Sequence, residues 1–352
     1  MKIKKLLCCT FAVAMLFSLV GNAYAAETED ESKDEAVILT IDEIDAKLAD
    51  LEDSAVGEGE GLKIGFIPST MVNPYFSAML EGVEAAMEKY PKAELVTFDP
   101  SNDITKQTSQ IEDMISMGVN ALLVVPIDTA GMRTTFQLCH DNDIFVINLD
   151  NPVIPDDYDQ VDALICSDNI QLGYLAGKDL AERMPDGGNI AVVGLPTAEA
   201  CVLNVEGFWK GIEENAADPS KFVQVAEADG QGNTETSYSK AVDILEANPD
   251  IDAWYCINDP SALGVLAAAQ EAGRAGDDML IYGKDASPDY KALMGTDGLV
   301  QSSAQSPIGM GKMGVEYAMQ LIGGQSVEFL THIAAISVTA ENVDEYGREG
   351  FL

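Results

Sequence analysis

The sequence predicts an α/β fold with two Rossmann-like lobes, each built on a parallel sheet, joined by a hinge of several strands. Short apolar runs alternate with amphipathic helical stretches almost without a break from residue 62 to residue 338. Such alternation is typical of parallel strands joined by crossover helices. A first lobe closes near 163–167, where the same alternation starts again. A mature chain of about 325 residues also exceeds what one core usually serves, so two domains are expected.

The stretch 62–90 predicts a strand, a loop and a helix, and the rest of the chain repeats this unit. The strand carries Leu62, Ile64, Phe66 and Ile67, and the helix has apolar residues at Phe76, Met79, Leu80, Val83 and Met87. Asn73 suits the N-cap and Pro74 the first helical position, where no backbone donor is needed. In open α/β sheets, ligands bind beyond the carboxyl ends of the strands. Asn73, Tyr75 and Phe76 are therefore expected to face a crevice.

The remaining elements follow in order along the chain. Strands are expected at 95–98, 121–125, 145–149, 190–194, 222–226, 253–257, 279–282, 299–304 and 333–338. Helices are expected from 104 to Gly118, through 136–138, and at 171–184, 206–214, 238–247, 261–272 and 309–322. We assign 62–167 plus 306–333 to an N-terminal lobe and 168–305 plus 334–352 to a C-terminal lobe.

The N-terminus has the pattern of a secretory signal peptide over residues 1–25. Three lysines precede an apolar run at 6–20, and Ala23-Tyr24-Ala25 fits a cleavage site. We expect cleavage near Ala25 and export to the periplasm or the exterior of the cell envelope. A transmembrane anchor is the alternative, but the apolar run is short for one.

Residues 26–61 predict an acidic leader and linker, because they hold 14 acidic residues and two lysines. Within this leader, Thr40 to Glu43 has the form of a capping box. Ile41, Ile44, Leu48 and Leu51 recur at helical spacing. One short amphipathic helix is therefore expected inside an otherwise solvated segment.

Composition excludes several classes of function. The chain has 20 Lys and Arg against 59 Asp and Glu, a formal net charge of −39, and removal of the three signal lysines makes it −42. Such a surface repels phosphate backbones, so no nucleic-acid partner is expected. The four cysteines after the signal match no metal or disulfide spacing, and we expect buried free thiols at Cys139, Cys166, Cys201 and Cys256. Two histidines leave little material for a zinc cluster or a histidine-based triad, so no metal and no cofactor are expected.

Polar side chains recur at the carboxyl ends of the predicted strands. They are Asp128, Asp150 with Asn151, Asp168 with Asn169, Asn258 with Asp259, Lys284 with Asp285, and Gln305. Carboxylates and amides that meet at one edge suit vicinal hydroxyls, while the rings of Tyr75 and Phe76 suit the apolar faces of a sugar. Each residue could instead cap the helix that follows it, and Asp128 and Asp168 are the foremost candidates for that structural role.

The order of these motifs resembles the sugar-binding type I periplasmic binding proteins, the group related to ribose- and galactose-binding proteins. The resemblance covers 62–338 and rests on I-G-F-I-P-S-T-M-V-N-P-Y-F at 64–76, V-I-N-L-D at 146–150, S-D-N at 167–169, E-G-F at 206–208, N-D at 258–259 and Y-G-K-D-A-S-P-D at 282–289. It implies an extracytoplasmic receptor of an ABC importer that binds a small sugar or polyol and delivers it to the transmembrane permease subunits. It places ligand contacts at Asn73, Tyr75, Phe76, Asp150, Asn258, Asp285 and Gln305.

The chain departs from that family pattern at three donor positions. Residues 202–205 replace an arginine before E-G-F, Asn151 stands where ribose binders tend to have arginine, and Val125 stands where asparagine is expected. With fewer fixed donors, ribose itself is doubtful as the ligand. Another pentose, a hexose, a polyol or a smaller hydroxylated ligand fits as well, and Lys284 is a candidate replacement donor.

We expect a monomeric binding protein that works by closure of its lobes around the ligand. The alternative function on the same fold is a receptor that binds a signalling molecule and then activates a membrane sensor. A glycoside hydrolase would need paired carboxylates from Asp150, Asp259 and Asp285, but no acid/base motif accompanies them, so no enzyme is expected. A transcriptional regulator of the lac repressor type would need a basic helix-turn-helix N-terminus, which this sequence lacks.

Overall fold

The computed structural model describes residues 36–51, 54–276 and 278–352. The predicted signal peptide and its cleavage site lie outside these residues. Within the part described, no helix is both long and apolar enough to span a bilayer. The described chain builds two sheets, one from seven strands and one from six.

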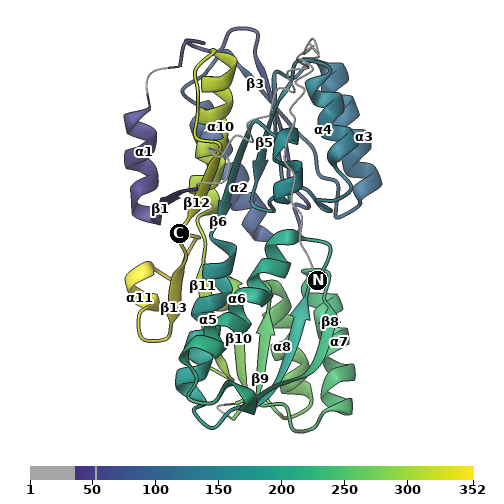
Figure 1. Cartoon of the computed structure of the whole chain (residues 1–352), viewed down its shortest axis with the longest axis vertical. Coiled ribbons are helices and arrows are strands. Elements are labelled where there is room, and N and C mark those ends of the chain that lie inside the picture. The colour runs from purple at the N-terminus through teal and green to yellow at the C-terminus, as the bar shows by residue number, and fades with distance from the viewer. Residues whose placement is uncertain (1–35, 52–53, 277) are drawn as a thin grey trace, which may run out of the picture. The chain divides into compact units, whose positions relative to one another are not determined.

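The first sheet is parallel throughout, with the strand order β1-β12-β6-β5-β4-β2-β3. Its strands are β1 (Val37–Leu39), β2 (Lys63–Ile67), β3 (Glu94–Thr97), β4 (Ala121–Val124), β5 (Phe145–Leu149), β6 (Ala163–Ser167) and β12 (Leu330–Ile333). Helices α2 (Pro74–Met87) and α10 (Pro307–Ile322) pack together over one face, and α3 (Ile104–Met117) and α4 (Arg133–His140) cover the other (Figure 1). Because both faces are covered, the central strands are apolar on both sides.

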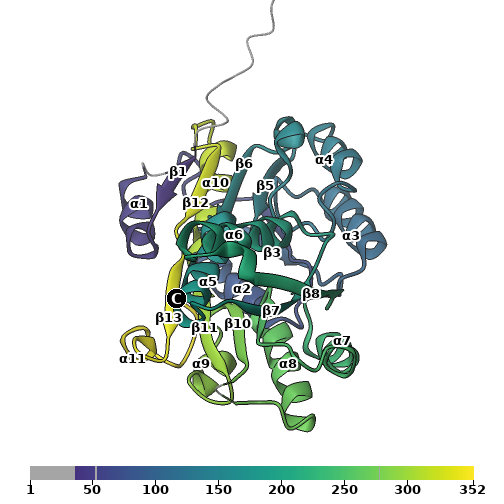
Figure 2. The ribbon, with the colours of Figure 1, turned by 60° about the horizontal axis from the view of Figure 1, so that its bottom comes forward.

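The second sheet has the order β13-β11-β10-β9-β7-β8, and only β13 runs antiparallel to its neighbour. Its strands are β7 (Gly188–Gly194), β8 (Phe222–Asp229), β9 (Ala253–Cys256), β10 (Leu280–Asp285), β11 (Leu299–Ala304) and β13 (Ile336–Thr339). Helices α5 (Asn169–Arg183) and α6 (Glu199–Asn215) share one core with it, and α7 (Thr234–Ala247), α8 (Asp259–Glu271) and α9 (Pro288–Leu293) share another (Figure 2). The short helix α11 (Val343–Tyr346) follows β13.

The chain passes between the two sheets three times. It leaves the first sheet after β6 to begin α5, returns after β11 to begin α10, and leaves again between β12 and β13. The α/β class and the hinge of several strands are therefore confirmed. We keep 62–167 plus 306–333 and 168–305 plus 334–352 as the proposed limits of a first and a second lobe.

The acidic stretch 26–61 holds more structure than the sequence predicts. Residues 37–39 form β1, which pairs in parallel with β12 as the edge strand of the first sheet. Helix α1 (Ile44–Asp50) follows and buries Ile44 against α10. The prediction of a short helix after Thr40 is confirmed, and the Glu43 carboxylate accepts from the Thr40 N–H at 2.8 Å. The prediction that the rest of the segment is solvated is wrong for 37–39, because a three-residue strand shows no periodic pattern and its partner lies almost 300 residues away.

Other differences concern element limits. The single strand predicted at 333–338 is two strands, β12 and β13, in different sheets. Helix α6 begins at Glu199, seven residues before the predicted start at 206. The expectation of buried free thiols is confirmed for Cys139, Cys166, Cys201 and Cys256.

Candidate functional site

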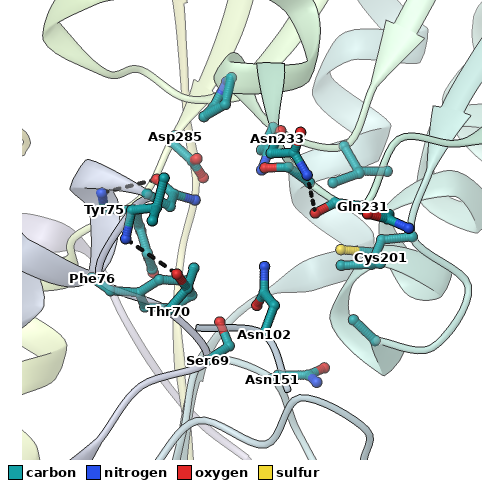
Figure 3. Close-up of a pocket in the computed structure, with 18 of the residues that line it drawn as sticks. Ser69, Thr70, Tyr75, Phe76, Asn102, Asn151, Cys201, Gln231, Asn233 and Asp285 are labelled. Carbon is teal, nitrogen blue, oxygen red and sulfur yellow. Dashed lines mark hydrogen bonds between the residues drawn. The ribbon is translucent and has the colours of Figure 1, made fainter. Parts of the chain in front are cut away.

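A cleft of about 950 Å³ is lined by loops of both lobes, and its walls include all seven residues predicted from the sequence. Asn73, Tyr75 and Phe76 lie at the start of α2, and Asp285 ends β10. Asp150, Asn258 and Gln305 follow β5, β9 and β11. Figure 3 shows Tyr75 and Asp285 on one side of the cavity and Gln231 and Cys201 on the other. The carboxyl ends of both sheets therefore face a common space, as expected for open α/β sheets.

Four of the predicted residues form one hydrogen-bonded chain at the floor of the cleft. The Tyr75 hydroxyl donates to Asp150 Oδ1 at 2.9 Å and lies 3.4 Å from Gln305 Oε1. Gln305 Nε2 donates to Asp285 Oδ1 at 2.7 Å, and the Ser167 hydroxyl donates to Gln305 Oε1 at 2.6 Å. Gln305 lies in the chain crossing between β11 and α10. A residue of the hinge thus fixes the carboxylate of Asp285, and Tyr75 fixes that of Asp150.

Asp150 and Asp285 both have a backbone conformation that residues other than glycine rarely adopt. Asp150 has φ of 61° and Asp285 has φ of 109°. Both values lie in the left-handed region, where a residue with a Cβ is strained. Strained residues of this kind concentrate at functional sites, since the surrounding structure must compensate for them. The strain supports a ligand-directed role for both aspartates.

Burial governs the protonation of these groups. Desolvation raises the pKa of Asp150 and raises that of Asp285 well above its usual range, although the nearby Lys284 ammonium opposes both shifts. Burial by itself lowers the pKa of Lys284, but the charge of Asp285, with further contributions from Asp150 and Asp259, brings it above its ordinary value. Lys284 therefore stays protonated at neutral pH.

Two predicted amides carry helix caps. Asn73 Oδ1 accepts from Tyr75 N at 3.0 Å and caps α2. Asn258 Oδ1 accepts from Ser261 N and its Nδ2 donates to the Gly232 carbonyl, both at 2.9 Å. Asn258 lines the cleft, but both ends of its amide are engaged in the protein. The sequence leaves two roles open for Asn258, helix capping and ligand contact. These hydrogen bonds correspond to the capping role.

Aromatic rings form the wall beside the floor. The rings of Tyr75 and Phe76 meet edge to face, with centroids 5.3 Å apart and an angle of 85°. Phe351, near the end of the chain, packs on Tyr75 with centroids 6.0 Å apart. Edge-to-face packing of this kind is favourable and fixes the positions of the rings.

Three other carboxylates at strand ends are structural. Asp168 caps α5 by accepting from Gln171 N at 2.9 Å, as expected. Asp128 accepts from the backbone N–H of Ala130 at 3.1 Å. Asp259 lies outside the cleft wall and accepts from the Ser302 hydroxyl and from Ser287 N, and burial raises its pKa to about 7.

Comparison with known proteins decides the family. A model of the periplasmic binding protein domain matches residues 64–326. This chain belongs to the periplasmic binding protein domain family. It is 30% identical over 273 residues to ribose import binding protein RbsB of Bacillus subtilis (strain 168), covering 77% of this chain and 85% of that protein. It is 28% identical over 267 residues to a putative rhizopine-binding protein of Rhizobium meliloti, covering 74% and 85%.

Solved structures of ABC transporter solute binding proteins are similar to this periplasmic binding protein. One from Bacillus halodurans C-125, with bound myo-inositol, has a TM-score of 0.74 and 29% identity, covering 84% of this chain and 99% of that chain. Another, from Actinobacillus succinogenes 130z with bound D-allose, has a TM-score of 0.73 and 25% identity, covering 81% and 100%. The comparisons thus confirm the resemblance that the motifs indicate.

Sequence reasoning missed several polar residues on the cleft wall of this periplasmic binding protein. Ser69, Asn102, Gln231 and Asn233 line the cavity, with Ser69 and Asn102 facing Gln231 and Asn233 across it (Figure 3). Asn102 follows β3, so the rule that found the other strand-end residues could have found it. Gln231 lies in the Gly-Gln-Gly turn that follows β8, so it too comes after the carboxyl end of a strand.

The charge of the cleft is mostly negative. Among the described residues that line it, Lys284 is the one cation, against the carboxylates of Asp150, Asp229, Glu235, Asp285 and Asp289. An anionic ligand would be repelled by these carboxylates, whereas hydroxyl groups can donate to them. The absence of arginine from the described wall agrees with the departures seen in the sequence.

Proposed function

We propose that this protein is the extracytoplasmic receptor of an ABC importer, binding a small sugar or polyol between its lobes and delivering it to transmembrane permease subunits. The observation that carries the proposal is the pair of oriented carboxylates, Asp150 and Asp285, joined through Tyr75 and Gln305 beside an aromatic wall. Carboxylates bind vicinal hydroxyls, and rings cover the C–H faces of a sugar.

Names of similar proteins support the same class of ligand. The similar proteins include ribose and D-allose binding proteins, and the similar structures hold myo-inositol or D-allose. We assign ligand contacts to Tyr75, Phe76, Asp150, Asp285 and Gln305. The Oδ1 of Asn73 caps α2, so its Nδ2 is the atom that contacts the ligand. Both ends of the Asn258 amide bond the protein, so Asn258 supports the site by holding the turn at Gly232.

Function would follow from closure of the lobes. Asp150 directly follows β5 of the first lobe, and Asp285 is the last residue of β10 in the second. A ligand that contacts both carboxylates stabilises the closed arrangement over the open one, and the permease recognises the closed complex. The protein acts as an exported monomer, cleaved near Ala25, and releases its ligand chemically unchanged.

A thermal-shift and calorimetric screen of the exported, purified protein tests this proposal. The probes are D-ribose, D-allose, D-galactose, myo-inositol and glycerol, with an amino acid and a nucleoside as controls. A ligand that binds only the folded state raises its melting temperature, so at least one polyol is expected to do so. Asp150→Ala is expected to abolish that shift while the protein stays folded. A shift with the amino acid or nucleoside alone would overturn the sugar or polyol assignment.

A further inference from the structure

Lys284 is a buried cation on the wall of the cleft with unused donors. It lies in β10, 6% of its surface is exposed, and it lines the cavity. Within the described residues its ammonium makes no hydrogen bond and a single ion pair, with Asp285 Oδ1 at 4.0 Å. That distance is too long for a hydrogen bond. A buried ammonium with three N–H donors requires an acceptor, and the cleft is the space that can supply one.

Acceptors with free capacity lie on the same floor. Asp150 and Asp285 each use one carboxylate oxygen, for Tyr75 and Gln305 respectively. In the part of the chain that the structure describes, the second oxygen of each carboxylate has no hydrogen bond. Asp150 and Asp285 both lie near enough to Lys284 for their charges to raise its pKa. The cleft wall thus presents a positive donor close to two negative acceptors.

We propose that Lys284 Nζ donates to a hydroxyl oxygen of the bound ligand while the same hydroxyl donates to Asp150 or Asp285. This contact rests on the proposed function. It adds a means by which the protein selects its ligand by charge. A hydroxyl accepts and donates through one atom, so it satisfies both signs at once. A ligand carboxylate only accepts and faces two aspartates, and a ligand ammonium only donates and faces Lys284. The floor therefore selects uncharged polyhydroxylated ligands over sugar acids and amino sugars.

Calorimetry with D-ribose, D-allose and myo-inositol tests the contact. Lys284→Met is expected to weaken the binding of each probe that binds the wild type by about 10-fold or more, the usual effect of losing a hydrogen bond to a charged group. Lys284→Gln, which keeps a neutral donor, is expected to lose less. The matched control is Lys312→Met, which removes a surface lysine paired with Asp45 and is expected to leave affinity unchanged. Unchanged affinity in Lys284→Met would overturn the inference.

A second measurement does not depend on whether Lys284→Met folds. Reductive methylation of the wild type, read by mass spectrometry, is expected to modify Lys284 more slowly in the presence of the bound probe, with Lys312 unaffected. Equal modification of Lys284 with and without the probe contradicts the contact. D-Ribonate and D-glucosamine are expected not to compete with the neutral probe, and competition by either at equal concentration contradicts the charge selection.

The two proposals fail in distinguishable ways. If no neutral probe binds the wild type, the proposed function fails. If a probe binds the wild type and loses affinity in Asp150→Ala but not in Lys284→Met, the receptor function stands and only the role of Lys284 falls.

Discussion

Asn151 Oδ1 accepts a hydrogen bond of 3.0 Å from the backbone N–H of Ala200, and the two residues belong to different lobes. Asn151 follows β5, its Nδ2 donates to the Pro126 carbonyl at 2.7 Å, and 4% of its surface is exposed. Ala200 lies in the first turn of α6, whose N-cap residue, Ala198, has no side chain able to cap. The first lobe therefore supplies an acceptor to the N-terminus of a helix in the second lobe.

Asn151→Ala is expected to shift the unliganded protein toward a more open arrangement of the lobes. The variant removes the acceptor that opposes their separation, and one such bond contributes ~1 kcal/mol, or a factor of about five in the equilibrium. Small-angle scattering of the ligand-free variant should give a larger radius of gyration than the wild type. Affinity for a bound polyol should fall by a similar factor, because closure then depends on the ligand alone.

The matched control for this prediction is Ala198→Ser. Ala198 has the extended backbone of an N-cap residue, so a serine there can accept from the first turn of α6 within its own lobe. The double variant Asn151→Ala/Ala198→Ser should have a higher melting temperature than Asn151→Ala alone. It should keep the larger radius of gyration of Asn151→Ala. An unchanged radius in both variants would show that the bond between the lobes does not influence closure.

Tyr75→Phe isolates the hydroxyl that orients Asp150. The variant keeps the ring and its contact with Phe76 but removes the hydroxyl that donates to Asp150 and lies 3.4 Å from Gln305 Oε1. Affinity for a bound polyol is expected to fall about 10-fold by calorimetry, since a hydrogen bond to a charged group contributes roughly 1.5–3 kcal/mol. Tyr238→Phe removes a surface hydroxyl that bonds Glu271 and should leave affinity unchanged. Equal affinities in wild type and Tyr75→Phe would exclude a role for this hydroxyl.

The fold, and the position of the seven candidate residues on the cleft wall, could be predicted because their signals are local. Each strand is a short apolar run, and each site residue directly follows such a run or opens a helix, as Asn73 and Asp150 do. Parallel strands bring their carboxyl ends to one edge, so local signals sufficed to predict a shared site. The same logic explains why Gln305, which follows β11, lies on the cleft wall.

Features that depend on long-range pairing could not be predicted. Strand β1 exists because three residues meet β12 from the far end of the chain. The use of both ends of the Asn258 amide depends on the position of Gly232, which no local pattern reveals. A capping amide and a ligand-binding amide occupy the same place after a strand, so sequence cannot separate them. The bond from Asn151 to Ala200 depends on how closely the lobes approach.

Gly177→Ala is expected to destabilise the second lobe. Gly177 lies where α5 crosses α6, and a Cβ there would come within 1.9 Å of the Phe208 carbonyl oxygen. Relief of that overlap requires the two helices to separate, and overpacking of this kind costs about 1–3 kcal/mol. Differential scanning calorimetry should show a lower melting temperature. Gly194→Ala is the control, since its Cβ would meet no atom closer than 3.8 Å. Equal melting temperatures for both variants would contradict close packing of α5 on α6.

His140→Gln is expected to reduce stability more at acidic than at alkaline pH. His140 Nε2 lies 3.1 Å from Asp162 Oδ2, and this hydrogen bond raises the pKa of His140 in the folded protein. A raised pKa means that the folded state binds the proton more tightly than the unfolded chain does. The stabilisation is therefore complete below the unfolded pKa of about 6.5 and is lost as pH rises through the folded value.

Urea unfolding of the wild type and His140→Gln at about pH 5.5 and about pH 8.5 measures this difference. The gap between the two proteins in free energy of unfolding should be larger at the lower pH. His332 has its pKa lowered by burial and works in the opposite direction, but it is present in both proteins and cancels from the gap. Asp162 also accepts from Val146 N at 2.7 Å, so its carboxylate keeps a partner in the variant. A gap that is constant or grows with pH would show that the proton on His140 does not stabilise the folded state.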